Sequence, residues 1–436
     1  WLLLRAWSEP RRMRYWAGAG AAFAVSFLGG HAQTWLFVAY AAAGWFVALA
    51  VGGFTDDRAK GERWARARIP GLAAFAVTAA GLAAAQVLPS VEFARLSVRA
   101  NVDYAYVSGG FALQDAWNLL LPGVLTQFSP LYIGVAGLGL ALLGALPALG
   151  GAINPGAGVM RYGRVYFVVL ALFGLLAGFG GNAFLYPVLY RIAPGWDLFR
   201  GQERAAFLAA FGLSMLAGYG MARLPGLEMG VRRRYALAYG ALVTAAVYAF
   251  GLLWQLQGRT AVGHTAYLWI AFLTLVVAMA LVVSMRLDGW SERRTWFVCG
   301  LAAANLFVAN FATNLDSGDP AAKVVLAPEV EALQVALADA HSAGESVPGR
   351  VYNEFRIYED YGMRGGIEDA WGSSPLRLSN YARLFDQFPL DRMWRLTGVG
   401  HVLTWRRELF GPSDLLAEFL QSADTTYLHQ LPEPNP

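Results

Sequence analysis

Two arginines four residues apart, Arg200 and Arg204, stand directly before a long apolar segment. Side chains at this spacing share one face of a helix, and the first backbone N–H groups of a helix attract anions. Two guanidinium groups beside a helix start would suit the phosphate or pyrophosphate of a lipid. The alternative is that both side chains reach toward lipid head groups or pair with Glu203 and Asp197.

A second set of charges, Glu92, Arg95 and Arg99, follows Ser90 at helical spacings. Serine is a favoured N-cap residue, so we expect a surface helix to begin there with the three charges along one face. One carboxylate and two guanidinium groups on such a face would contact a phosphate head group. The alternative is an ordinary solvated face with a Glu–Arg pair.

His31 and Gln33 lie in a short turn after Gly29 and Gly30, between the first two apolar segments. Histidine is the commonest general acid or base, so we place both residues in the candidate binding site. A lone histidine at a helix turn is also typical of a residue that only forms a local hydrogen bond.

The sequence carries no recognisable metal or nucleotide motif. Its five histidines are scattered, without the HExxH or Cys/His spacings of zinc sites. The single Cys299 excludes a disulfide within the chain. No cofactor is therefore identified; a divalent metal would be compatible with the chemistry considered below, but the sequence supplies no ligand set for it.

Membrane helices are the elements that must position these residues. Hydrophobic residues make up 57% of the chain and charged residues only 15%, unlike an average soluble domain. Pairs of small residues, such as Gly174 with Gly178 and Gly212 with Gly218, favour close packing of membrane helices. Because a crossing helix needs roughly 20 apolar residues, the sequence predicts a polytopic α-helical membrane bundle of about nine transmembrane helices, over residues 15–30, 32–52, 70–88, 130–150, 165–180, 205–223, 235–256, 265–285 and 295–314.

Basic residues alternate between successive gaps of these runs. About eighteen Lys and Arg residues fall in every second gap and six fall in the others. Because short loops rich in Lys and Arg stay in the cytoplasm, this pattern predicts a multi-pass protein of the cell membrane. Arg95, Arg99, Arg200 and Arg204 then lie on the extracytoplasmic side. The basic excess serves topology, so we expect no nucleic-acid partner.

The composition changes near Asp316, which predicts two domains: the bundle over residues 1–314 and a small extracytoplasmic α/β domain over 315–436. Amphipathic spacing predicts a helix over 328–340. The sequence also predicts three short strands, over 350–354, 402–405 and 425–429. The tail ends where a further strand would be natural, so we expect this domain to be incomplete.

Several short motifs follow one another along the chain: Gly29-Gly30-His31-Ala32-Gln33-Thr34, Gln86-Val87-Leu88-Pro89, Gly180-Gly181-Asn182, Leu198-Phe199-Arg200 and Gly366-Ile367-Glu368-Asp369-Ala370-Trp371. In this order they resemble the YfhO-like family of bacterial membrane proteins. The resemblance extends over nearly the whole chain. One departure is Ala32, where the family often has proline.

The resemblance implies a GT-C-like membrane glycosyltransferase. Such an enzyme takes a sugar from a polyprenyl-phosphate donor and transfers it to a cell-envelope glycan or polymer on the extracytoplasmic face. The catalytic Asp or Glu of that class lies in the first outer loop, which would precede Trp1 here, so no catalytic residue is assigned. We expect the chain to be a fragment that lacks the N-terminal region and the extreme C-terminus.

Two other classes of function stay open. A transporter or flippase for lipid-linked sugars would carry charges within its helices and an internal repeat. A non-catalytic, membrane-anchored binding protein would use the tail domain, where the segment 368–371 would line a sugar site or pack Trp371 into the domain. The enzyme hypothesis instead requires the lipid-phosphate and substrate-binding residues to converge on one outer cavity: Arg200, Arg204, Glu92, Arg95, Arg99, His31 and Gln33.

Overall fold

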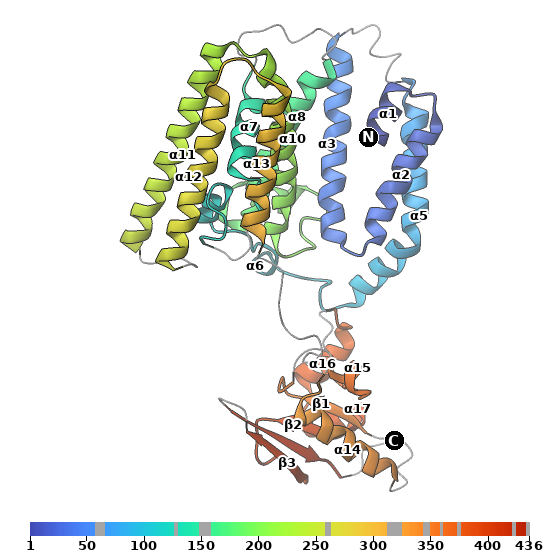
Figure 1. Ribbon diagram of the computed structural model, residues 1–436. Helices are drawn as coiled ribbons and strands as arrows, with labels where there is room; N and C mark the ends of the chain where they lie inside the picture. Colours follow the sequence, from blue (N-terminus) through green and yellow to red (C-terminus); the bar gives the residue numbers. More distant parts are fainter. Residues whose placement is uncertain are drawn as a thin grey trace. The chain divides into compact units, whose positions relative to one another are not determined.

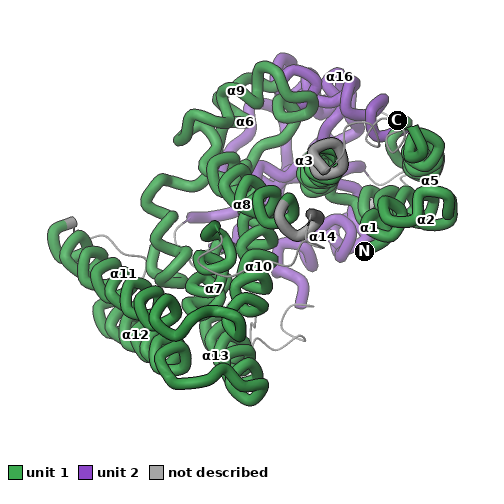
Figure 2. The backbone as a smooth tube through the Cα atoms, turned by 90° about the horizontal axis from the view of Figure 1, so that it is seen from above, with its two compact units in different colours: residues 1–88, 102–315 green, residues 89–101, 316–436 purple. Residues whose placement is uncertain are grey.

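The computed structural model describes residues 1–56, 66–125, 130–147, 158–257, 263–311, 325–342, 349–357, 361–372, 376–420 and 424–432. The chain divides into two compact units, coloured separately in Figure 2. Unit 1 contains residues 1–88 and 102–315, and unit 2 contains residues 89–101 and 316–436. The predicted domain boundary at 314/315 lies outside the described residues. Segment 89–101, which the sequence assigned to the bundle, groups with the tail.

Unit 1 is helical throughout its described part (Figure 1). The last residues of one helix, α5, already belong to unit 2. The helices are α1 (Leu2–Ser8), α2 (Met13–Leu28), α3 (Ala32–Asp56), α5 (Ile69–Leu96), α6 (Tyr104–Val107), η1 (Leu113–Leu119), α7 (Val135–Ala145), α8 (Gly158–Gly178), η2 (Gly180–Asn182), α9 (Leu185–Ile192), η3 (Gln202–Ala205), α10 (Ala206–Arg223), η4 (Leu224–Gly226), α11 (Met229–Gln257), α12 (His264–Arg286) and α13 (Glu292–Asn310).

Within the described residues, five helices are long and apolar enough to cross a membrane: Ala32–Val51, Ile69–Leu96, Gln202–Gly226, Met229–Leu256 and His264–Arg286. They match five of the nine predicted runs. The other four runs correspond to α2, α7, α8 and α13. Of these, α2 has 16 residues and α7 has 11, fewer than the roughly 20 that a crossing requires. Nine crossings are therefore not confirmed.

Glycines bring α7, α8 and α10 into close contact, and these helices lie side by side in Figures 1 and 2. A Cβ built on Gly220 of α10 would lie 1.9 Å from a carbonyl oxygen of α7, and one on Gly144 of α7 would lie 2.0 Å from a carbonyl oxygen of α10. Gly174 and Gly212 face the α8–α10 contact in the same way, at 2.5 and 2.9 Å. Gly218, by contrast, faces open space.

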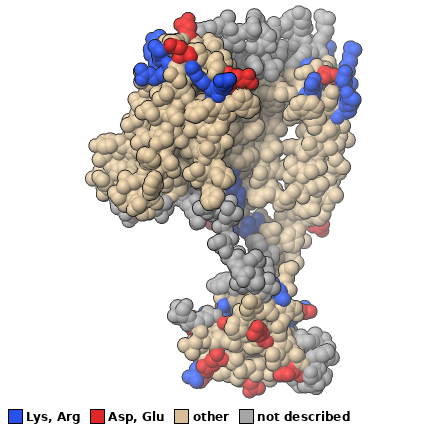
Figure 3. Space-filling model, in the orientation of Figure 1, with Lys and Arg blue, Asp and Glu red and all other residues tan. Residues whose placement is uncertain are grey.

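One end of unit 1 carries the arginines that mark the predicted inner side, and Figure 3 shows Lys and Arg gathered there, away from the uncharged flank of the bundle. These arginines also close helix ends. Arg223 donates through Nη1 to the carbonyl oxygens of Leu143 and Leu146, at 2.8 and 2.7 Å, where α7 ends. Arg232 does the same for two carbonyl groups at the end of α12. The basic end is thus part of the fold as well as a topology signal.

Unit 2 contains a four-stranded sheet in the order β1-β2-β4-β3, formed by β1 (Arg350–Asn353), β2 (Val399–Thr404), β3 (Asp414–Leu420) and β4 (Thr425–Gln430). Strands β1 and β2 are parallel, whereas β4 pairs with β2 and β3 in antiparallel fashion. The helices of this unit are α14 (Pro328–Ser342), α15 (Tyr361–Gly365), α16 (Ser379–Gln387) and α17 (Leu390–Thr397).

The predicted α/β tail is confirmed, since α14, β1, β2 and β4 fall where the sequence places them. Strand β3 was missed. Its sequence, Asp-Leu-Leu-Ala-Glu-Phe-Leu, lacks a regular alternation, because β3 is an edge strand with mostly exposed side chains. Such a strand has no continuous buried face to impose the alternation.

Acid is expected to destabilise unit 2 through His401. This side chain is 2% exposed in β2, and neither ring nitrogen has a hydrogen-bond partner among the described residues. Burial lowers the pKa of His401 below its usual value, so the unfolded chain, with a pKa near 6.5, takes up the proton first. The stabilisation is complete above about pH 6.5 and falls as the pH drops below it.

Thermal unfolding of the full chain at pH 7.5 and 5.5 tests this expectation. The midpoint should fall at the lower pH in the natural chain and in the His31→Gln control, whose histidine is exposed. The His401→Phe variant should lose most of this dependence. An equal fall in all three proteins would contradict the assignment.

Candidate functional site

Gln33 and Arg204, which lie 171 residues apart, meet in unit 1. Gln33 is the second residue of α3 and is only 3% exposed. Its Oε1 accepts a hydrogen bond from Arg204 Nη1 at 2.8 Å, while its Nε2 donates to the Gly201 carbonyl oxygen at 3.2 Å. Arg204 Nη1 also donates to the Arg200 carbonyl oxygen at 3.1 Å. We call these residues, with Gln202, the Gln33–Arg204 cluster.

The loop before α10 holds this cluster in one conformation. Gly201 has a φ of +78°, which favours glycine. A Cβ there would also lie 2.9 Å from Arg204 Nη1 and 2.9 Å from Glu203 Oε1. Gln202 is buried, and its Nε2 donates to the carbonyl oxygens of Val107 and Phe199. The turn, rather than a helix face, therefore sets the position of Arg204.

Aromatic side chains support the same loop from inside unit 1. Trp196 is buried against Phe37, with 5.1 Å between ring centroids. The hydroxyl of Tyr186 donates to the Trp196 carbonyl oxygen at 3.0 Å, and that of Tyr40 donates to the Pro194 carbonyl oxygen at 3.0 Å. These contacts connect the loop to α3 and α9, and no sequence pattern predicted them.

Arg200 supplies a second cation to the cluster. Its guanidinium carbon lies 5.6 Å from the centroid of the Tyr106 ring, within the range of a cation–π contact. Both Arg200 and Arg204 are exposed. Within the described residues, neither forms an ion pair with Asp197 or Glu203, so the predicted pairing alternative is wrong. The expected shared helix face is wrong too, because Arg200 precedes η3 and Gly201 interrupts the helix.

His31 has a structural role at the start of α3. Its Nδ1 lies 2.8 Å from the Thr34 hydroxyl and accepts a hydrogen bond from the Thr34 backbone N–H at 3.2 Å. These bonds satisfy a donor of the first helical turn. The structure thus supports the local hydrogen-bond alternative for His31, although the residue lies only two positions from Gln33.

Glu92 and Arg95 lie three residues apart on one helix, as predicted, but Arg99 does not extend their face. Helix α5 continues through Pro89 to Leu96, so Ser90 lies inside a helix and is not an N-cap. Arg99 lies beyond the end of that helix. The helix can continue through Pro89 because proline removes one backbone donor but has a φ that is compatible with a helix. All three charges belong to unit 2, whereas the Gln33–Arg204 cluster belongs to unit 1.

Asp115 is a buried carboxylate of unit 1 that the sequence did not single out. Burial raises the pKa of its carboxyl group, and a hydrogen bond from the Ala112 backbone N–H partly offsets this effect. That bond, 3.0 Å long at Oδ2, caps η1. The contact indicates a structural role for Asp115.

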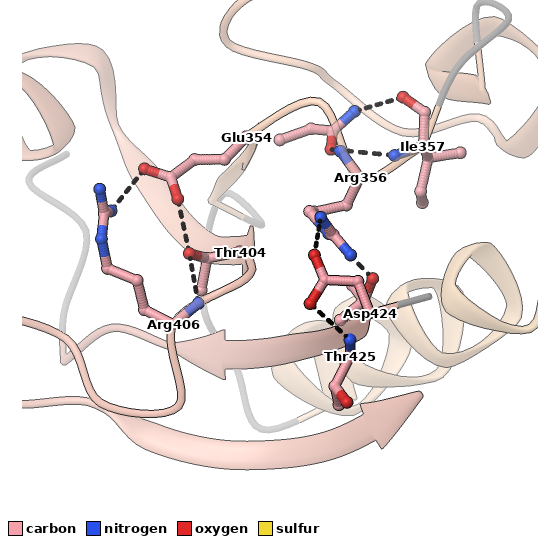
Figure 4. Close-up of polar contacts among 9 residues, drawn as sticks. Glu354, Arg356, Ile357, Thr404, Arg406, Asp424 and Thr425 are labelled. Atoms are coloured by element: carbon pink, nitrogen blue, oxygen red, sulfur yellow. Dashed lines mark hydrogen bonds and ion pairs between the residues drawn. The ribbon is translucent and has the colours of Figure 1, made fainter. Parts of the chain in front are cut away.

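A second polar cluster lies in unit 2, at the edge of the sheet where β1 and β2 end (Figure 4). Glu354 follows β1, and its Oε1 pairs with Arg406 Nη1 at 2.6 Å. Its Oε2 accepts a hydrogen bond from the Thr404 hydroxyl at 2.5 Å. Both charged side chains are largely buried. Ligand sites of α/β sheets lie outside the carboxyl ends of the strands. Polar residues directly after two predicted strands could therefore have indicated this cluster from the sequence.

Arg356 and Asp424 extend this cluster toward β4. Arg356 Nη1 pairs with Asp424 Oδ2 at 3.0 Å, and Arg356 Nε donates to the Thr426 hydroxyl at 3.0 Å. With Glu354 and Arg406, the four charges sum to zero. The tail therefore has a polar cluster of its own, separate from the arginines of unit 1.

The segment 368–371 packs against other residues of unit 2, which favours the packing alternative for Trp371 over a sugar site. Glu368 pairs with Arg350 at the surface, at 3.3 Å. The ring of Trp371 lies 4.4 Å from Phe385 between centroids, and the Arg377 guanidinium carbon lies 3.7 Å from the Trp371 centroid. Among the residues that the structure describes, no group of three or more His, Cys, Asp and Glu side chains could hold a metal ion.

Comparison with family models found no match, and neither curated proteins nor solved structures gave a similar chain. The YfhO-like resemblance therefore stays a prediction. The geometry alone assigns the Gln33–Arg204 cluster as the candidate site of the bundle.

Proposed function

We propose that the protein binds the phosphate or pyrophosphate of a polyprenyl-linked sugar at the Gln33–Arg204 cluster. In this proposal it transfers the sugar to a cell-envelope acceptor on the extracytoplasmic face. The observation that carries the proposal is the pair of exposed guanidinium groups of Arg200 and Arg204. Arg204 is held by Gln33 and Arg200 contacts the Tyr106 ring, and among the described residues neither forms an ion pair with a carboxylate.

The contacts of Arg204 leave a binding edge available. Its described hydrogen bonds use Nη1 only, so Nε and Nη2 are left to donate to two oxygens of one phosphate group. Gln33 is buried and holds this geometry before any ligand arrives, which lowers the entropic cost of binding. Arg200 adds a second positive charge beside the same loop.

The direction of the helices supports an extracytoplasmic site. Helices α3 and α10 both begin at the cluster, and α10 ends at Arg223 among the arginines of the basic end. The cluster and the basic end are thus at opposite ends of α10. If the basic end faces the cytoplasm, as its Lys and Arg content favours, the cluster faces outward.

The two guanidinium groups are suited to glycosyl transfer because of where negative charge would develop in that reaction. Cleavage of the bond between sugar and phosphate leaves charge on the phosphate oxygens, and guanidinium groups held in place stabilise such charge. The acceptor hydroxyl also needs a general base. None is assigned in this chain.

Arg204→Gln is expected to weaken the binding of farnesyl phosphate at least about tenfold, because a charged hydrogen-bond donor is lost. Gln33→Leu should have a smaller effect, since it frees the guanidinium without removing it. Titrations of the full chain in nanodiscs would measure both dissociation constants. Inorganic phosphate, titrated in parallel, shows whether the lipid chain contributes.

Arg191→Gln is the matched control, because Arg191 is exposed on the nearby helix α9 and has no described contact. Its affinity for farnesyl phosphate should match that of the natural chain. Equal losses in the Arg191 and Arg204 variants would mean that general surface charge, not this cluster, attracts the ligand.

A further inference from the structure

Exposed aromatic rings surround Arg406 at the edge of the sheet in unit 2. The Arg406 guanidinium carbon lies 4.6 Å from the Trp405 centroid and 5.3 Å from the Phe410 centroid. Trp405 is 54% exposed and Phe410 is 81% exposed. Exposure of a large aromatic side chain to water is unfavourable. Two exposed rings beside one arginine therefore suggest a binding role.

Phe355 adds a third ring on the β1 side of the same edge. It directly follows Glu354, the carboxylate that pairs with Arg406. Its φ of +55° is the sole positive value for a non-glycine within the described part of the chain. Such a conformation is strained in a bulky residue, and strained residues cluster at active sites, ligand sites and switch regions. The ring is nevertheless 64% exposed, so the strain does not serve to bury it.

The polar groups between these rings are held rigidly. Glu354 uses one oxygen for Arg406 and the other for Thr404. The Thr404 hydroxyl in turn accepts a hydrogen bond from the Arg406 backbone N–H at 3.1 Å. The described bonds of the Arg406 side chain use Nη1 only, so its other nitrogens can donate. A planar donor thus lies beside the rings of Trp405 and Phe410, and its carboxylate partner is the residue before Phe355.

The charge of this edge selects among ligand classes. Arg406 is neutralised by Glu354, and the next residue, Arg407, pairs with Glu418 at 3.6 Å. A phosphate or an anionic lipid surface would therefore meet no free positive charge from these residues. A sugar ring matches the edge, because its C–H face packs on an aromatic ring and its hydroxyl groups bond to planar polar groups.

We propose that Phe355, Trp405 and Phe410, together with Glu354 and Arg406, bind a neutral carbohydrate at the carboxyl edge of the sheet in unit 2. The carbohydrate site belongs to unit 2, and its argument does not rest on the proposed phosphate site of the bundle. The aromatic rings supply the affinity, and the Glu354–Arg406 pair orients the hydroxyl groups.

Ligand-observed NMR titration of the full chain in nanodiscs tests the proposal. The probes are four neutral sugars: cellotetraose, maltotetraose, mannotetraose and chitotetraose. At least one should bind, and Trp405→Ala and Phe410→Ala should each weaken that binding about three- to tenfold, as expected for the loss of one stacked ring. Trp405→Phe should keep most of the affinity.

The matched control is Phe388→Ala, which removes an exposed aromatic ring of the same unit at the end of α16. It should leave sugar binding unchanged, and equal thermal midpoints would show that all variants are folded. Absence of binding by all four probes would overturn the proposal. Insertion of Trp405 into the membrane would also overturn the proposal. In that case brominated nanodisc lipids would quench part of the tryptophan fluorescence, and this quenching would be lost in Trp405→Phe.

Discussion

Gly220→Ala is expected to destabilise unit 1 by about 2–3 kcal/mol, as overpacking of a tight contact typically does. The added methyl group would lie 1.9 Å from the Leu140 carbonyl oxygen. Backbone atoms cannot rotate away as a side chain can, so α7 and α10 must separate and lose contact along their length. Gly144→Ala should act in the same way from the other helix, where the distance is 2.0 Å.

The control for this prediction lies on the same helix. Gly218 faces open space, and alanine is a better helix former than glycine by about 1 kcal/mol. Gly218→Ala should therefore leave the stability unchanged or raise it. Thermal or denaturant unfolding of the purified variants would compare them, and equal shifts for Gly218→Ala and Gly220→Ala would refute the packing described for α7 and α10.

Arg232→Ala is expected to cost about 2 kcal/mol, because it leaves the carbonyl group of the buried Met285 without its described side-chain donor. The Leu287 carbonyl oxygen keeps a hydrogen bond from Arg294 Nη1, at 3.1 Å. Arg232 Nε donates to Met285 and Nη2 donates to Leu287, each at 2.8 Å. The guanidinium carbon also lies 5.9 Å from the Trp290 centroid. Loss of the side chain should therefore loosen the connection between α12 and α13.

Arg234→Ala provides the comparison, since Arg234 is exposed and its one hydrogen bond within the described residues is to Gly230 of its own helix. Its unfolding free energy should change by less than about 0.5 kcal/mol. Arg232→Lys should recover part of the loss, because one ammonium group cannot serve both carbonyl groups as the guanidinium does. If the two alanine variants unfold alike, the capping role of Arg232 is wrong.

The hydrophobic runs, and the basic residues in every second gap between them, were enough to predict a helical bundle with a basic end. They could not predict which side of a helix meets a neighbour. Gly212 and Gly218 lie on one helix and looked equivalent, yet Gly212 faces α8 and Gly218 faces open space. The decisive contact of Gly144 with Gly220 joins two helices, and no local pattern records such a pairing.

The two arginines of the candidate site could be predicted from the sequence, but their contacts could not. Arg200 and Arg204 stood out as basic residues on the side that carries few of them, and both belong to the cluster. The partnership of Arg204 with Gln33 is a tertiary contact, and the turn at Gly201 replaces the expected helix face. The Ser90 prediction failed because a local capping signal could not overrule the helix that already continues through Pro89.

The hydrogen bond between Gln33 and Arg204 also sets an order of events during biosynthesis. Translation proceeds at about 5–20 residues per second, so a spacing of 171 residues separates the two side chains by roughly 9–35 s. During that interval Gln33 has left the ribosome without the partner that it has in the folded protein. The proposed phosphate site therefore forms only after the start of α10 has been synthesised. A nascent chain arrested earlier would contain α3 but not this site.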